Sequence, residues 1–361
     1  MSDAFRALLK KVGSGPHTGK DLSRSESAAA TRMMLTQEAT PAQIGAFMIA
    51  QRIKRPTGEE LAGILDAYEA LGPCLQPISA PYPTLVMGIP YDGRSRTAPC
   101  SPLVALILAT IECPVLHHGG IRMPTKYGIP LIELWQGLGV DWSGLSLGQV
   151  QSIFAATKLG FVYLPSHFPA AHDLVIYRDQ IGKRPSLATA ELLWCPYMGD
   201  RIVISGYVHP PTEALFQKTS ILRQVPHFIT VKGLEGSCDL PRDRTSIIGI
   251  NQPGQHPAFE RILLPPRDYD MAAAEVPLPA ETELFQGMQA VLAGTSSELT
   301  QLTLWNAGFF LWRCGHAPSL KAGMVEAEAL LQAGVVLQTL NDLKLAVEGI
   351  SKGDRHIPSE I

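Results

Sequence analysis

Two short apolar segments, each running into a polar loop, constrain the fold of this 361-residue chain most strongly. Leu85–Pro99 and Cys113–Gly128 both read as a strand followed by a loop that contains Gly, Arg or His. The run between them, Ser101–Glu112, is long enough to form a helix that crosses over a sheet. Such a βαβ unit places both loops at the carboxyl end of a parallel sheet, where open α/β folds bind their ligands. The two loops therefore mark the expected binding site.

The side chains of these loops predict an anionic ligand, most simply a phosphate. Guanidinium groups hold phosphate oxygens through paired donors, and histidines that titrate near neutrality would bind phosphate best below about pH 6.5. A solvated loop is the alternative interpretation of the arginines. For the histidine pair the alternative is one histidine buried and hydrogen-bonded to the backbone and the other exposed, and the sequence leaves both alternatives open. The candidate phosphate-binding residues are Gly88, Asp92, Gly93, Arg94, Arg96, Ser101, His117, His118, Gly119 and Arg122.

Composition narrows the class of protein. Hydrophobic residues make up 46% and charged residues 17%, which is typical of a compact globular chain. The net charge of −3 argues against a generally basic nucleic-acid binder, so any positive site must be local. None of the six cysteines forms a CxxC pair, so the sequence indicates no zinc ribbon. The longest apolar stretch, Pro102–Ile111, is shorter than the roughly 20 residues that span a bilayer. We therefore expect a cytoplasmic protein.

Helix signals dominate the first 75 residues. Thr40 precedes Pro41 as an N-cap, and Thr57 with Glu60 forms a capping box. The proline-rich stretch Pro73–Pro83 then reads as a linker. We expect a small helical domain at residues 1–75, to which a helical stretch near residues 170–195 is a candidate addition.

Strand-like and helical runs alternate beyond the linker, which predicts the α/β class. We expect residues 76–361 to form one domain with a mainly parallel central sheet flanked by helices. The expected strands are Thr84–Gly88, Pro114–His117, Gly160–Tyr163, Ile202–Ser205, Phe228–Val231 and Ser246–Ile250. The expected late helices are Glu281–Ala293, Glu298–Gly315 and Ser319–Glu348, and the segment Gln252–Val276 reads as a long loop.

Four segments spread along the chain carry a family resemblance. Thr40–Ala67, Leu131–Gly139, Ser166–Pro185 and Trp305–Gly315 are similar, in that order, to segments of the anthranilate phosphoribosyltransferase family and its pyrimidine phosphorylase relatives, glycosyltransferase family 3. The resemblance implies a helical domain beside an α/β domain, an active site in the cleft between them, and a homodimer formed through the helical domain. It also implies transfer of ribose 5-phosphate from phosphoribosyl pyrophosphate to the amine of anthranilate, with Mg²⁺ assisting the departing pyrophosphate.

The resemblance assigns further residues. His167 and Arg178 match residues that contact the acceptor, and Glu235 and Asp239 fall on the family's magnesium motif. An ion pair on a helix surface is an equally good interpretation of Arg178. A plain acidic turn is the alternative for Glu235 and Asp239.

The motifs themselves depart from the family pattern. Pro90 and Tyr91 replace two glycines of the first binding loop, His117–Gly120 replaces Lys-His-Gly-Asn, and Cys238 replaces the first metal-binding Asp. These changes argue against efficient catalysis of the family's own reaction and leave open whether the chain is an enzyme. We expect a phosphoribosyltransferase-like protein that binds phosphoribosyl pyrophosphate or a similar phosphate-bearing ligand. The alternative is a non-catalytic protein that binds nucleic acid or nucleotides on the same scaffold.

Overall fold

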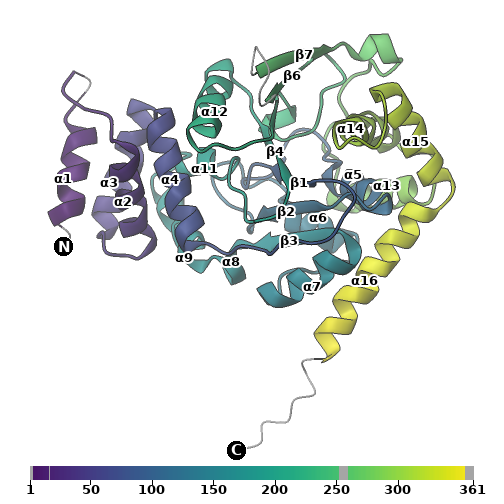
Figure 1. Ribbon diagram of the computed structural model, residues 1–361, viewed down its shortest axis with the longest axis horizontal. Coiled ribbons are helices and arrows are strands. Elements are labelled where there is room, and N and C mark those ends of the chain that lie inside the picture. The colour runs from purple at the N-terminus through teal and green to yellow at the C-terminus, as the bar shows by residue number, and fades with distance from the viewer. Residues whose placement is uncertain (1–2, 16, 252–258, 354–361) are drawn as a thin grey trace, which may run out of the picture.

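Two lobes make up the computed structural model, which describes residues 3–15, 17–251 and 259–353 (Figure 1). The first four helices lie together at the left of Figure 1, and we call them the helical lobe. They are α1 (Asp3–Gly13), α2 (Arg24–Leu35), α3 (Pro41–Lys54) and α4 (Gly58–Leu71). The remainder, which we call the α/β lobe, surrounds a single sheet.

The helices of the helical lobe begin where capping residues predict. Ser23, Thr40 and Thr57 each start a helix with a complete capping box, which confirms the predicted starts at Thr40 and Thr57. Helices α2 and α4 pack closely because Gly63 has no side chain. A Cβ atom there would lie 2.2 Å from the carbonyl oxygen of Arg24. Close packing of α2 and α4 fixes the inner layer of the helical lobe.

Seven strands form the central sheet in the order β3-β2-β1-β4-β5-β6-β7. The first five pair in parallel, whereas β6 and β7 are antiparallel additions at one edge. A mainly parallel sheet is thereby confirmed. The strands are β1 (Thr84–Gly88), β2 (Val115–Gly119), β3 (Leu159–Tyr163), β4 (Arg201–Gly206), β5 (Phe228–Val231), β6 (Ser246–Asn251) and β7 (Phe259–Leu264).

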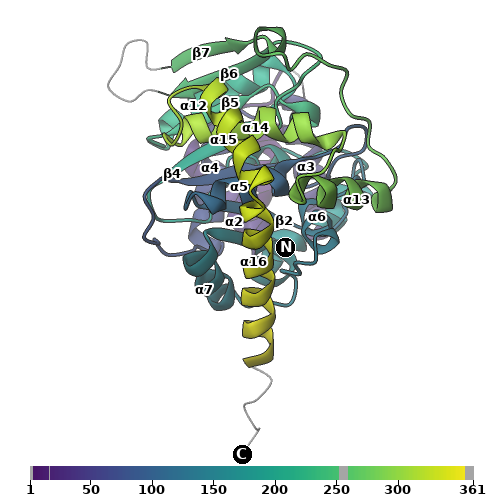
Figure 2. The same ribbon diagram turned by 90° about the vertical axis from the view of Figure 1, so that its right-hand side faces the viewer.

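Helices cover the sheet on both sides. Helix α5 (Ser101–Thr110) packs against β2 and β3. Three late helices, α14 (Leu299–Arg313), α15 (Leu320–Gln332) and α16 (Val335–Gly353), pack over α5. Figure 2 shows this layer from outside, with α16 extending beyond the body of the lobe. Further helices of the α/β lobe are α6 (Leu131–Gly137), α7 (Leu147–Thr157), α12 (Pro210–Leu222), η1 (Leu234–Gly236), η2 (Pro266–Tyr269) and α13 (Glu281–Leu292).

The short helices that follow β3 join the two lobes. They are α8 (Leu164–His167), α9 (Pro169–His172), α10 (Val175–Gln180) and α11 (Leu187–Ala190). Helix α10 packs against α3, α11 packs against α4, and α12 contacts both α4 and β5. The carboxyl ends of the central strands therefore face a region that both lobes border.

Two expectations about the end of the chain were wrong. The segment expected to be a long loop, residues 252–276, contains β7 and η2 in its described part, and its first residues, 252–258, lie outside the described residues. The single helix expected over Ser319–Glu348 is two helices, because Gly334 adopts a left-handed φ of +73° that ends α15. Within the described part of the chain, no helix has both the length and the apolarity needed to cross a bilayer.

Candidate functional site

The loop that follows β1 is held in place by two glycines. Gly88 ends β1 opposite Ser205 of β4, and a Cβ atom at Gly88 would lie 1.9 Å from the backbone oxygen of Leu192. Gly93 has a φ of +74°, which a residue with a side chain adopts only with strain. Backbone hydrogen bonds in both directions between Arg94 and Ile129 then tie this loop to the loop after β2. Both loops lie at the carboxyl end of the sheet, as the βαβ interpretation predicted.

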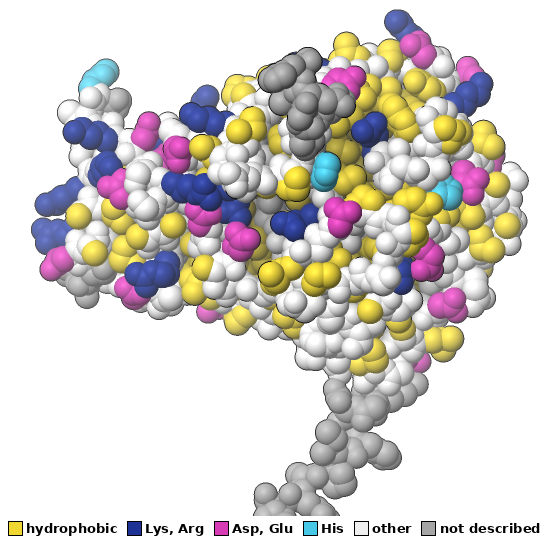
Figure 3. Space-filling view, viewed as in Figure 1, with side chains coloured by type: hydrophobic (Ala, Val, Ile, Leu, Met, Phe, Trp, Pro, Cys, Tyr) yellow, Lys and Arg dark blue, Asp and Glu magenta, His cyan; other side chains and the backbone are white. Residues whose placement is uncertain are grey.

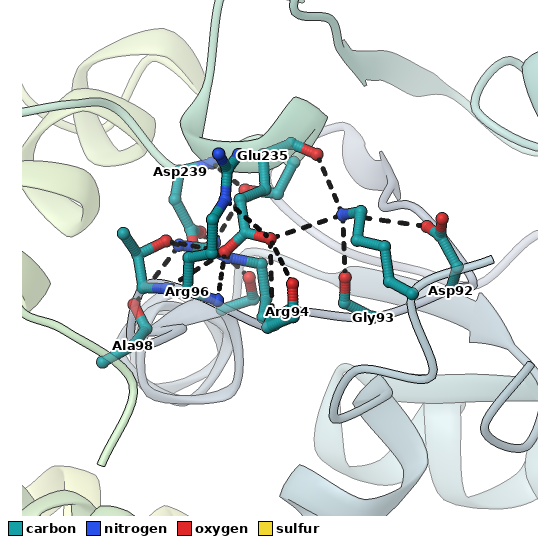
Figure 4. A network of polar contacts seen from close by, with 12 residues as sticks. Asp92, Gly93, Arg94, Arg96, Ala98, Glu235 and Asp239 are labelled. Carbon is teal, nitrogen blue, oxygen red and sulfur yellow. Dashed lines mark hydrogen bonds and ion pairs between the residues drawn. The ribbon is translucent and has the colours of Figure 1, made fainter. Parts of the chain in front are cut away.

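Arg94 is buried among acidic groups. Its Nη1 donates to the Oδ2 of Asp239 at 2.5 Å and to the Oγ of Ser237 at 2.9 Å. Its Nε lies 3.5 Å from the Oε1 of Glu235, and its side chain is only 4% exposed. Ser101 donates to the second oxygen of Asp239 at 3.0 Å. The guanidinium of Arg94, which the sequence predicted to bind a phosphate, is thus bound by the protein's own carboxylates (Figure 4).

Glu235 occupies the anion-binding position of the β1 loop. Its carboxylate accepts hydrogen bonds from the backbone N–H groups of Ser95, Arg96 and Thr97 at 3.0–3.2 Å. Burial alone would favour the neutral acid, but these N–H groups and the nearby cations outweigh it and lower the pKa of Glu235 to about 2. A row of convergent backbone N–H groups is the arrangement that binds phosphate in other folds. In this chain a carboxylate already fills it.

Two more cations border Glu235. The Nζ of Lys126 lies 3.5 Å from the Oε2 of Glu235 and donates to the backbone oxygen of Gly93 at 3.0 Å. The Nε of Arg96 lies 3.8 Å from the same carboxylate oxygen, while 76% of the Arg96 side chain is exposed. Arg96 therefore reaches solvent at the rim of the loop.

The carboxylates of Glu235 and Asp239 do not fit Mg²⁺ in this arrangement. Magnesium requires several oxygen ligands arranged around a small ion, whereas Arg94, Ser101 and the loop N–H groups already occupy these oxygens. Cys238, between them, is buried with its Sγ near the backbone oxygens of Gly88 and Ile204. Across the residues that the structure describes, no cluster of three or more His, Cys, Asp or Glu could hold a metal ion.

The two histidines of β2, His117 and His118, do not titrate near neutrality, so that expectation was wrong. Both imidazoles are fully buried, and burial lowers the pKa of His117 and of His118 to about 3. Trp135 donates to the Nδ1 of His117 at 3.3 Å, and the hydroxyl of Tyr91 lies 2.5 Å from the Nδ1 of His118. Both are neutral at pH 7, and neither is the exposed histidine that the alternative expected. Gly119, which follows them, has the ring of Tyr91 close beside it.

Arg178 is buried in a second ion cluster. Its Nη1 lies 3.3 Å from the Oε2 of Glu191, and its Nη2 lies 3.8 Å from the Oδ2 of Asp92. Asp92 also lies 3.8 Å from the Nε of Arg184 and 3.9 Å from the Nζ of Lys126. Burial raises the pKa of Glu191, although the guanidinium of Arg178 opposes that effect. Arg178 is therefore an ion-pairing residue, but in the interior and not on a helix surface.

Two other predicted residues have partners within the protein. The Nδ1 of His167 accepts a hydrogen bond from the N–H of Tyr163 at 2.9 Å, and its Nε2 lies 2.8 Å from the backbone oxygen of Leu145. Arg122 forms ion pairs with Glu133 and Glu281 at 2.5 Å. Arg94 and Arg122 border one cavity of about 320 Å³, and Arg96 is not part of its lining.

Arg184 and Glu191 are residues of the site that reasoning from the sequence missed. Arg52 lies in the last turn of α3 and Arg184 follows α10, and both border a cavity of about 210 Å³ between the lobes. Arg184 lies within a segment that carries the family resemblance, so its position held a signal. Glu191 has no such signal, because only the fold brings it to Arg178.

A helical bundle beside a mainly parallel sheet, with charged clusters at the carboxyl end of the strands, defines a two-lobed α/β fold. The structure of the Saccharomyces cerevisiae anthranilate phosphoribosyltransferase in complex with PRPP and Mg superimposes with a TM-score of 0.82 at 16% identity, covering 96% of this chain and 99% of that chain. The Thermus thermophilus enzyme gives a TM-score of 0.77 at 19% identity over 96% of this chain and all of that chain.

Sequence comparisons support the same relationship. The glycosyl transferase family helical bundle domain matches residues 6–72. The anthranilate phosphoribosyltransferase of Afipia carboxidovorans is 27% identical over 95% of this chain and 98% of that protein. The enzyme of Azorhizobium caulinodans is 26% identical over 97% of this chain and 98% of that protein. Over nearly its whole length the chain is therefore similar to anthranilate phosphoribosyltransferases, and residues 6–72 match the helical bundle domain of the glycosyl transferase family.

Proposed function

We propose that this chain is a divergent phosphoribosyltransferase-like protein that binds a phosphate-bearing small molecule between its two lobes without requiring Mg²⁺. The observation that carries the proposal is the position of Arg94, whose guanidinium lies between the carboxylates of Asp239 and Glu235. A fixed cation there supplies positive charge at the place where the family motif would supply a metal ion.

The surroundings of Arg178, which the family resemblance assigns to the acceptor, also support a divergent function. In the family resemblance, Arg178 would hold the carboxylate of anthranilate. Here Glu191 and Asp92 surround that guanidinium within 3.8 Å. A ligand carboxylate would have to displace a buried protein carboxylate, which costs several kcal/mol unless the displaced charge finds a new partner. Transfer to anthranilate is therefore not the activity we propose for this chain.

The cations that still face the region between the lobes favour a phosphate ligand. Arg96 is largely exposed at the rim of the β1 loop, and Arg52 and Arg184 border the cavity between the lobes. Hydrogen bonds to charged groups contribute roughly 1.5–3 kcal/mol each, so two or three such contacts give useful affinity.

Thermal unfolding in the presence of ligands tests this proposal. Phosphoribosyl pyrophosphate at about 100 times its dissociation constant should raise the free energy of unfolding by about 2.7 kcal/mol, and Mg²⁺ should not be needed. Stabilisation that appears only with Mg²⁺ would contradict the role assigned to Arg94. Stabilisation by a short oligonucleotide and not by phosphoribosyl pyrophosphate or pyrophosphate would instead favour the nucleic-acid alternative.

A turnover assay tests the statement that this chain does not transfer ribose 5-phosphate to anthranilate. The protein is mixed with phosphoribosyl pyrophosphate, anthranilate and Mg²⁺, and the loss of anthranilate fluorescence is followed. We expect no turnover above background. Turnover at ordinary enzyme rates of about 1–10³ s⁻¹ would refute the proposal. A homodimer formed through the helical lobe remains a prediction, which light scattering on the purified protein would check.

A further inference from the structure

A cavity lies at the carboxyl end of β4, beside the two ion clusters described above. It shares Arg184 with the cluster around Arg178. Its volume is about 210 Å³, and both lobes contribute to its wall. The helical lobe provides Arg52, the connection between α10 and α11 provides Arg184, and β4 leads into it through Gly206 and Tyr207. Lys and Arg side chains, with acidic side chains beside them, lie along the junction of the lobes on the face that Figure 3 shows.

The lining of this cavity is cationic. It contains the guanidinium groups of Arg52 and Arg184 and the imidazole of His209, and it contains no carboxylate. The Nη1 of Arg52 donates to the backbone oxygen of Arg184 at 2.6 Å, which holds the two arginines next to each other. The Nε of Arg184 lies 3.8 Å from the nearest carboxylate oxygen of Asp92, beyond hydrogen-bond distance. Donors of both guanidinium groups therefore remain for an anion.

The rest of the wall suits a small polar molecule with one anionic group. Pro90, Leu192 and Val208 give it apolar contact, and the side chains of Thr189 and Thr212 bring hydroxyl groups. Thr212 lies in the first turn of α12, whose amino end adds a favourable partial positive charge. Pockets for drug-sized ligands measure about 300–1,000 Å³, so this cavity fits a smaller molecule.

We propose that this cavity binds the phosphate group of a small sugar phosphate, with Arg52 and Arg184 as the phosphate ligands. The inference rests on the proposed function, which places a phosphate-bearing ligand between the lobes, and deepens it by naming the subsite and the class of ligand. The β1 loop is not that subsite, because Glu235 already binds its N–H groups. A phosphate held by guanidinium groups from both lobes also couples binding to the relative position of the lobes.

Binding of ribose 5-phosphate, followed by thermal unfolding and isothermal titration calorimetry, tests the inference. Ribose, which lacks the phosphate, is the ligand control. We expect the wild-type protein to bind ribose 5-phosphate and not ribose. Arg52→Gln should weaken binding about tenfold or more, because it removes charge-assisted hydrogen bonds. Arg184→Gln should weaken binding by at least as much.

Two matched variants give the comparison. Arg55→Gln removes the same charge at the same end of α3 but lies outside the cavity, so it should leave binding within about twofold of wild type. Arg96→Gln removes the exposed cation at the β1 loop and tests whether that loop, and not the cavity, holds the phosphate.

The outcomes separate the inference from the proposed function. If Arg96→Gln weakens binding and Arg52→Gln does not, the subsite assigned here is wrong while phosphate binding between the lobes stands. If wild type binds phosphoribosyl pyrophosphate but not ribose 5-phosphate, the ligand class is wrong and the proposed function again stands. If wild type binds neither compound, both fail.

Discussion

Replacing Glu235 by Gln is the perturbation that most directly tests the β1-loop network. The amide keeps the size of the side chain and one acceptor oxygen, but it removes the negative charge. Three backbone N–H groups and the cations Arg94, Arg96 and Lys126 then lose an anionic partner. The side chain of Glu235 is only 2% exposed, so water cannot replace the lost interactions without a change of structure.

The expected magnitude follows from the pKa of the carboxyl group. Lowering it from the ordinary value of 4.5 to about 2 corresponds to about 3 kcal/mol at neutral pH, since each pKa unit is about 1.4 kcal/mol. A depressed pKa gives stability that is fully present above pH 4.5 and is lost as the pH falls toward 2. The variant should therefore be about 3 kcal/mol less stable than wild type at pH 7, and only about 1.5 kcal/mol less stable at pH 3.

Urea denaturation at pH 7 and pH 3, followed by tryptophan fluorescence and circular dichroism, measures both differences. The control is Glu281→Gln, which removes an ion pair with Arg122 at a position where 58% of the acidic side chain is exposed. That change should cost less than about 1 kcal/mol at either pH. A loss below about 1 kcal/mol for Glu235→Gln at pH 7, or the same loss at both pH values, would refute the reasoning.

Three further predictions concern other parts of the site. Arg94→Met leaves two buried carboxylates facing each other and should lower the free energy of unfolding by about 3–5 kcal/mol in urea denaturation; a smaller loss than for Glu281→Gln would contradict the network. The pKa of His118 is about 3, below its ordinary 6.5, so the folded protein loses stability as the pH falls below 6.5; His118→Phe should flatten that loss between pH 6.5 and 4, and an unchanged slope of stability against pH would count against it. Gly88→Ala brings a methyl group against the backbone at Leu192 and should lower the yield of soluble protein or the melting temperature, whereas Gly144→Ala, where a Cβ meets nothing within 4 Å, should not.

The sequence predicted the parts of the fold that depend on local signals. Capping boxes at Thr40 and Thr57 mark helix starts because the cap and its partner are three residues apart. The βαβ unit at Thr84–Gly119 was found because β1 and β2 are short apolar runs on either side of a long apolar helix. β7 was missed because its strand, Phe259–Leu264, alternates weakly and is only partly buried at a sheet edge.

The contacts within the candidate site were harder to predict, because the type of a residue does not reveal a partner that is distant in the chain. Arg94 and Asp239 are 145 positions apart, and their ion pair depends on the strand order of the whole sheet. The sequence therefore showed a basic loop and an acidic turn as two separate features. The residue types of His117 and His118 gave no sign of their burial, which arises because both lie on β2 between the strands β3 and β1.

The pairing of Arg94 with Asp239 and Glu235 bears on how such a chain could change during evolution. A substitution that removed only the arginine would leave two carboxylates facing each other in the interior. One that removed only an acidic partner would weaken the support of a buried cation. A different arrangement of these three side chains thus needs at least two coordinated replacements, each costly alone. Selection for stability by itself would therefore preserve the arrangement of Arg94, Asp239 and Glu235, whatever ligand the chain binds.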